Sequence, residues 1–122
     1  GEYITDALFE LNYIFRDLDS NLVTKVDTRL IDILAATARL LQSNEPFSVS
    51  RAFVAYPKTV ERGSKPENIT IANFHNQGRA VDILQMRSRS LRQMQRAAAS
   101  CQAGGVGLYA DYLHIDSGRL KS

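Results

Sequence analysis

The chain has 122 residues, of which 44% are hydrophobic and 23% charged, as in a globular domain that buries its core without disulfides. Its net charge of +2 is too small to predict binding to nucleic acid, so we expect no such partner. The single cysteine excludes an internal disulfide, and no stretch reaches the length of a transmembrane segment. No signal peptide opens the sequence, but Gly1 is typical of a trimmed chain, so export is not excluded.

Two helices are predicted in the first third of the chain, over residues 5–17 and 28–42, because apolar residues recur there at helical spacing. Thr5 or Asp6 can cap the first helix, and Asp27 can cap the second.

A strand is predicted over residues 47–54, where "FSVSRAFV" alternates at strand period, although Arg51 takes one position on the apolar side. Residues 55–73 are polar and contain two prolines and a glycine, which indicates an irregular loop with at most one short helical turn. The apolar segment "GRAVDIL" that follows, residues 78–84, predicts a second strand.

A third long helix is predicted over residues 88–102, with Ser88 or Ser90 as its cap and Gly104 as its natural end. Cys101 lies near the end of this helix, where we expect a small buried thiol.

Two short strands close the chain, "GVGLY" over residues 105–109 and "YLHID" over residues 112–116, with a tight turn at residues 110–111. The order of elements lacks the regular strand–helix alternation of a doubly wound parallel sheet. We therefore expect an α+β fold, a small and mostly antiparallel sheet flanked by helices.

The chain has only two histidines, His75 just before the second predicted strand and His114 within the last one. Asp82 lies between apolar neighbours in the second strand, where a carboxylate is costly unless a partner compensates it. Two imidazoles and one carboxylate form a ligand set that zinc accepts while keeping a fourth position for water. A histidine is more often a surface or core residue than a ligand, and the separation of 39 positions is no evidence by itself.

Two further carboxylates flank His114. Asp111 precedes it by three positions, so both side chains reach one site only if the backbone turns between them. Asp116 follows by two positions, on the same strand face, and can orient the His114 ring. Amide hydrolysis needs an activated water and a base for its proton, and Asp111 is the candidate base.

The segments "HNQGRAVDI" and "GGVGLYADYLHIDSGR" resemble motifs of the zinc-dependent peptidoglycan peptidases of the D-alanyl-D-alanine carboxypeptidase superfamily. The resemblance is strongest to the murein endopeptidase branch once known only as a domain of unknown function. It extends to "LNYIFRDLDSNLVTKVDTRLIDIL" and so spans nearly the whole chain. It implies the fold of the Hedgehog signalling domain and cleavage of peptide bonds in bacterial cell-wall peptides.

This resemblance implies that His75, Asp82 and His114 bind zinc and that Asp111 is the acid/base carboxylate. Asn73 stands where the motif has serine, and it can still donate a hydrogen bond. The loop before Asp111 is also shorter than in the family.

A larger departure is "SVSRAFVAY", where the family has Ile-Ser-Gly-Tyr-Arg-Ser. Val54 then replaces the arginine that would bind the substrate carbonyl or carboxylate. Arg51 and Arg79 are candidates to bind the substrate in place of this missing arginine. A regular strand places Arg51 on the opposite face from Val54, so it helps only if a bulge intervenes, and the second strand could aim Arg79 at solvent.

We therefore expect one zinc metallopeptidase domain over residues 1–122 that acts on peptidoglycan peptides in the periplasm or outside the cell. Association with a larger assembly or a phage-like particle is part of this expectation. The alternative is a zinc-stabilised cell-wall-binding module with weak or no catalysis, which Val54 favours and Asp111 disfavours. A wall-anchoring domain without metal is a third possibility.

Overall fold

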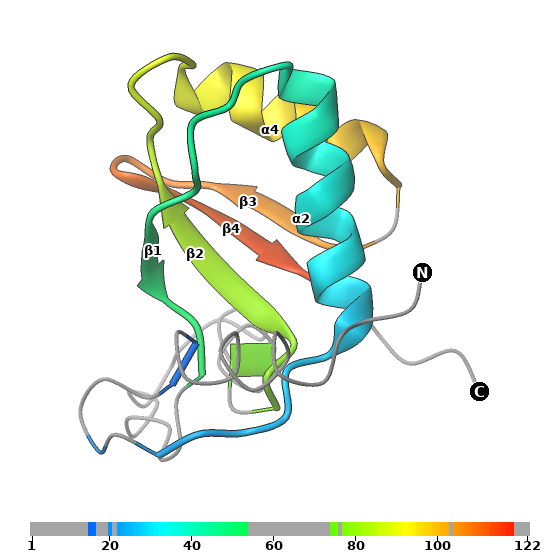
Figure 1. The fold of residues 1–122 in the computed structure, drawn as a ribbon, viewed down its shortest axis with the longest axis vertical. Coiled ribbons are helices and arrows are strands. Elements are labelled where there is room, and N and C mark those ends of the chain that lie inside the picture. The colour runs from blue at the N-terminus through cyan, green and yellow to red at the C-terminus, as the bar shows by residue number, and fades with distance from the viewer. Residues whose placement is uncertain are drawn as a thin grey trace, which may run out of the picture.

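The computed structural model describes residues 15–16, 20, 22–53, 74–75, 77–102 and 104–118. Within these residues lie two helices and one antiparallel sheet of four strands in the order β1-β2-β4-β3 (Figure 1). The expected α+β class with a small antiparallel sheet is therefore confirmed. No helix in the described part of the chain is long and apolar enough to cross a membrane.

The helices are α2, Thr28–Leu41, and α4, Leu91–Ser100, and both are slightly shorter than predicted. Asp27 caps α2 as expected, because its carboxylate accepts a hydrogen bond from the Arg29 N–H. Ser90 rather than Ser88 caps α4. It exchanges hydrogen bonds with Gln93 in a capping box.

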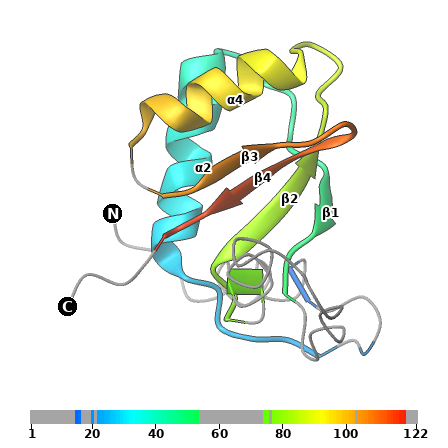
Figure 2. The same cartoon turned by 180° about the vertical axis from the view of Figure 1, so that it is seen from behind.

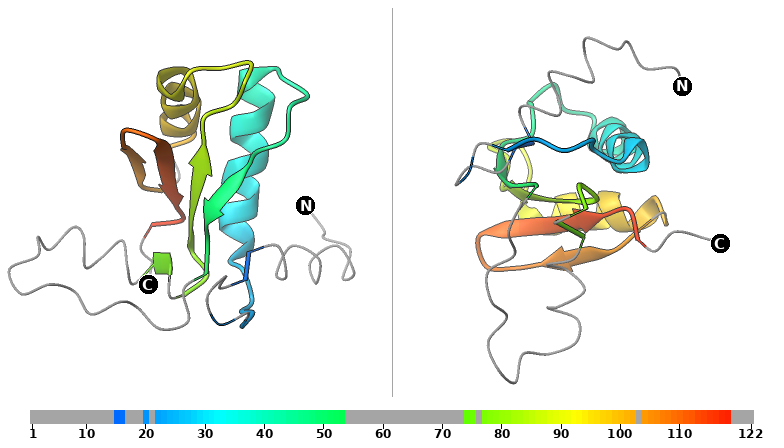
Figure 3. Two further views of the ribbon diagram at one scale, coloured as in Figure 1. Left: turned by 90° about the vertical axis from the view of Figure 1, so that its left-hand side faces the viewer. Right: turned by 90° about the horizontal axis from the view of Figure 1, so that it is seen from below.

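The strands are β1 Val49–Arg51, β2 Ala80–Leu84, β3 Val106–Leu108 and β4 Tyr112–Asp116. Only β4 has the predicted bounds. A register shift interrupts the pairing of β1 with β2, which is one reason why β1 is much shorter than the alternating sequence indicates. The left view of Figure 3 shows β2 between β1 and the β3–β4 hairpin.

One face of the sheet forms the core together with the helices. Figure 2 shows α4 lying across α2 beside the strands. The buried side chains of this face alternate along β2 and β4 and pack with apolar residues of both helices: Val81, Ile83, Leu113, Ile115, Leu30, Ile33, Met94 and Ala98. The intervening strand residues, which include the polar ones, must face the other side of the sheet.

Other predictions have mixed outcomes. Of the helix expected over residues 5–17 the structure describes only Phe15 and Arg16, which lie in a turn and a bend. The loop expected over residues 55–73 lies outside the described residues. Cys101 is half-buried rather than buried, because it lies at the C-cap of α4, where its thiol contacts Thr37 and the Ala97 carbonyl.

Candidate metal centre

Three polar side chains meet on the face of the sheet that is turned away from the core. Asp82 and His114 are direct partners across the β2–β4 pair, and His75 comes from a helical turn just before β2. All three are buried, and one nitrogen or oxygen atom of each lies within 4.8 Å of the others. The structure thus brings together the three residues expected to bind metal.

The two histidines explain why a carboxylate is tolerated inside β2. Asp82 Oδ1 lies 2.9 Å from His114 Nδ1 and 3.3 Å from His75 Nε2. Burial raises the pKa of Asp82, but the neighbouring His114 and His75 rings outweigh burial and hold the pKa below its usual value. The carboxylate is therefore ionised and faces two imidazole nitrogens.

The outer side of the His75 ring is held by the backbone. His75 Nδ1 lies 2.6 Å from the Ala52 carbonyl oxygen, so Nδ1 carries the proton and donates it. His75 Nε2 then faces the cluster. It is buried and has no hydrogen-bond partner in the described part of the chain, although Asp82 Oδ1 lies 3.3 Å away. A buried ring nitrogen that receives no hydrogen bond is suited to bind a metal ion.

Asp116 holds the outer side of the His114 ring. His114 Nε2 lies 2.8 Å from Asp116 Oδ2, while the other oxygen of Asp116 accepts hydrogen bonds from the N–H groups of Gly105 and Gly118 at 2.9 and 2.8 Å. This arrangement directs His114 Nδ1 toward Asp82, as a carboxylate–histidine pair does in many zinc sites.

These contacts also perturb the protonation of His114 and Asp116. Burial lowers the pKa of His114, but hydrogen bonds with Asp116 and Asp82 outweigh it and raise the pKa to about 9. Burial raises the pKa of Asp116, but its bond with His114 and the backbone donors lower it overall. In the metal-free chain His114 is therefore a cation between two carboxylates. A divalent cation that replaced its Nδ1 proton would keep the positive charge at this point, so the cluster fits zinc.

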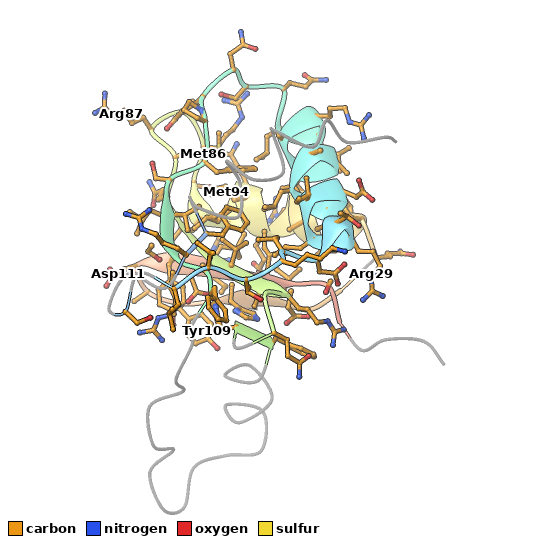
Figure 4. All side chains as sticks on the ribbon, turned by 60° about the horizontal axis from the view of Figure 1, so that its bottom comes forward. Arg29, Met86, Arg87, Met94, Tyr109 and Asp111 are labelled. Carbon is orange, nitrogen blue, oxygen red and sulfur yellow. The ribbon has the colours of Figure 1, made fainter. Side chains whose placement is uncertain are left out.

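Asp111 lies apart from this cluster. The predicted turn is present, since the Tyr109 N–H donates to the Tyr112 carbonyl and closes the hairpin. Asp111 is exposed in the turn of this hairpin, and Figure 4 shows it at the edge of the folded part. The metal-binding group found among the described residues does not include it.

The other expected site residues lie in different environments. Asn73 and Val54 lie outside the described residues. Arg79 is buried rather than aimed at solvent: its guanidinium lies over the Phe74 ring and bonds to Ser117 and Gln77. The orientation expected from the strand is wrong because Arg79 precedes β2 and turns toward these groups.

Several contributions to the site were not predicted. The Ala52 carbonyl is one, and no sequence signal identifies a backbone acceptor. The role of Gly105 is another, because a Cβ at this position would lie 2.6 Å from Asp116 Oδ2. The sequence indicated only that Gly104 ends the helix, whereas the missing side chain of Gly105 makes room for the Asp116 carboxylate.

A pair of tyrosines also lies beside the cluster. The rings of Tyr109 and Tyr112 stack with centroids 4.7 Å apart and an interplanar angle of 11°. Burial raises the pKa of Tyr112, and the negative charge of Asp82 raises it further. The repeated tyrosines around the predicted turn were a signal that the sequence offered.

Comparison with known proteins gives consistent matches along the chain. The family model described as "Peptidoglycan L,D-endopeptidase MepK" matches residues 1–122. A protein of that name from Escherichia coli (strain K12) is 30% identical over 121 residues, which is 98% of this chain and 66% of the relative. A probable peptidoglycan L,D-endopeptidase MepK from Haemophilus influenzae is 25% identical over 118 residues, 94% of this chain and 63% of the relative. The chain thus spans just under two thirds of these relatives. No solved structure matches it significantly.

Proposed function

The chain belongs to the peptidoglycan L,D-endopeptidase MepK family, and from this premise we propose that it is a zinc-dependent peptidase that hydrolyses amide bonds in stem or cross-link peptides of peptidoglycan. The observation that carries the proposal is the buried Nε2 of His75, which has no hydrogen-bond partner among the described residues and faces the Asp82 carboxylate beside His114.

His75 Nε2, His114 Nδ1 and the Asp82 carboxylate would hold the zinc ion. When bound, zinc lowers the pKa of a coordinated water to about 7 and polarises a carbonyl group. The chain itself orients the ligands. The Ala52 carbonyl and the Asp116 carboxylate fix the two imidazole rings, so that both ligand nitrogens face one point before the ion arrives.

Proton transfer is assigned to Asp111 in this proposal. Its carboxylate would accept a proton from the attacking water and deliver it to the leaving amine. Because Asp111 is exposed at the end of the hairpin, the proposal requires the turn between Tyr109 and Tyr112 to bring it toward the cluster when substrate binds.

The second candidate function is a zinc-stabilised binding module with weak or no catalysis. The exposed position of Asp111, apart from the three candidate ligands, favours it. In either case the partner is peptidoglycan peptide, so the proposed site of action is the periplasm, or the cell wall reached from outside, as in a virion-associated protein.

Hydrolysis of purified muropeptides distinguishes the two functions. We expect the zinc-loaded protein to release products of single amide cleavage, identified by mass, and the chelator-treated protein to release none. A folded, zinc-loaded protein that binds muropeptides and yields no product would refute the peptidase and leave the binding module.

A further inference from the structure

An irregularity in β1 places Arg51 on the same face of the sheet as the metal cluster. Val49 pairs with Ile83, and a regular antiparallel strand would then pair Arg51 with Val81, on the core face. The register shift between Val49 and Arg51 instead pairs Arg51 with Asp82. Bulges commonly re-aim a side chain next to an active site, and this one turns a cation from the core face to the face that carries the metal cluster.

Arg51, Asp82, His114 and Gly107 consequently form a row across the four strands, because each is the direct partner of the next. Direct partners in an antiparallel sheet share a face. Arg51 is exposed, and no hydrogen bond or ion pair joins its side chain to any residue in the described part of the chain. Among the described residues its guanidinium therefore has no partner, and it lies at one end of the row that contains the candidate ligands.

The stacked tyrosines lie at the other end of this row. A Cβ built on Gly107 would lie 3.1 Å from the Tyr109 ring and 3.7 Å from the His114 Cβ, so the missing side chain leaves room for the ring beside His114. Tyr112 shares the face of His114 because it lies two positions earlier in β4, and its partner across β2 is Leu84, which is 42% exposed. The rings of Tyr109 and Tyr112 and the exposed side chain of Leu84 thus lie beside the cluster, on the side of the β3–β4 hairpin.

We propose that Arg51 and the pair of Tyr109 and Tyr112 form a substrate subsite for a peptide that carries a free carboxylate, the arginine binding the carboxylate and the rings packing against the peptide chain. This inference rests on the proposed function, because it defines the substrate class of the same site. The remaining charged groups of the row are the candidate ligands. Arg51 is therefore the group in the row that can attract an anion without displacing the metal.

Binding of a product-like peptide tests the subsite without turnover. The probes are a peptidoglycan stem tripeptide with a free C-terminal carboxylate and the same tripeptide as its C-terminal carboxamide, titrated into the zinc-loaded protein by calorimetry. We expect the acid to bind about five- to tenfold more tightly than the amide, the scale of one solvent-accessible charge-assisted hydrogen bond. In Arg51→Gln this ratio should fall to about one, and in Arg51→Lys part of it should return.

Two further variants separate the roles. Arg92→Gln removes an exposed arginine of α4, on the core side of the sheet, and should keep the full ratio. Tyr109→Ala should weaken the acid and the amide equally. Circular dichroism and zinc content show whether each variant is folded and loaded.

An Arg51→Gln variant that keeps the wild-type ratio, or a wild-type protein that binds neither peptide at millimolar concentration, overturns the subsite. Failure of the subsite and failure of the peptidase give different results. Muropeptide hydrolysis with an unchanged ratio in Arg51→Gln removes the subsite alone, whereas the acid preference without hydrolysis removes the peptidase alone.

Discussion

Replacing Asp116 with alanine removes the acceptor of three hydrogen bonds, one from His114 and two from the backbone of Gly105 and Gly118. The His114 N–H is buried and would be left unpaired, at a cost of about 1–3 kcal/mol. The two glycine N–H groups are closer to solvent, and each loss costs about 0.5–1.5 kcal/mol. We expect the free energy of unfolding of the metal-free chain to fall by about 2–6 kcal/mol.

The same change should release the His114 ring from its orientation. Loss of the group that orients a histidine ligand typically lowers metal affinity by about 10–100-fold, and we expect this for zinc in Asp116→Ala. Urea unfolding gives the stability, and competition with a chromophoric chelator gives the zinc affinity. Asp111→Ala is the matched control. Its exposed carboxylate should leave the stability within about 0.5 kcal/mol of wild type. An Asp116→Ala variant with wild-type stability and zinc affinity would refute the reasoning.

Three further predictions concern the base, the protonation of His114 and the missing arginine. Asp111→Asn should keep its zinc and lose hydrolysis by about 10²–10⁴-fold; if metal analysis showed zinc lost from Asp111→Asn and retained by Asp82→Asn, the two roles would be exchanged. The pKa of His114 is raised from 6.5 to about 9, so its stabilisation of the metal-free chain is complete below about pH 6.5 and lost as pH rises through 9. Urea unfolding should show a lower stability at pH 9.5 than at pH 7, and equal values would contradict the His114 pairing. Val54→Arg should raise a weak native turnover by up to about 10²-fold at equal zinc loading; robust native turnover that this change leaves unaltered would point to another donor.

Local sequence patterns predicted the elements whose formation depends on neighbouring residues. Asp27 has the residue type and position of a helix cap, and its carboxylate accepts the bond that such a cap requires. The alternation in "YLHID" placed His114 on the face opposite to Leu113, and β4 has the predicted bounds. Asp82 inside an apolar strand indicated a compensating partner, and the cross-strand pairing supplies His114.

The features that were missed depend on contacts between distant segments. The register shift that turns Arg51 toward Asp82 arises from how β1 pairs with β2, and no residue in "FSVSRAFV" indicates it. Arg79 is buried because Ser117, nearly 40 positions later, and Phe74 provide its partners. The separation of Asp111 from the cluster likewise follows from the position of the hairpin end, which the spacing of three residues could not determine.

The metal content of the purified protein tests most directly whether His75, Asp82 and His114 together hold one zinc ion. We expect one zinc per chain after purification without chelator, and most of it lost in both His75→Ala and His114→Ala while the variants remain folded. A wild-type protein that contains no zinc and takes up none on reconstitution, or histidine variants that retain a full equivalent, would contradict the account.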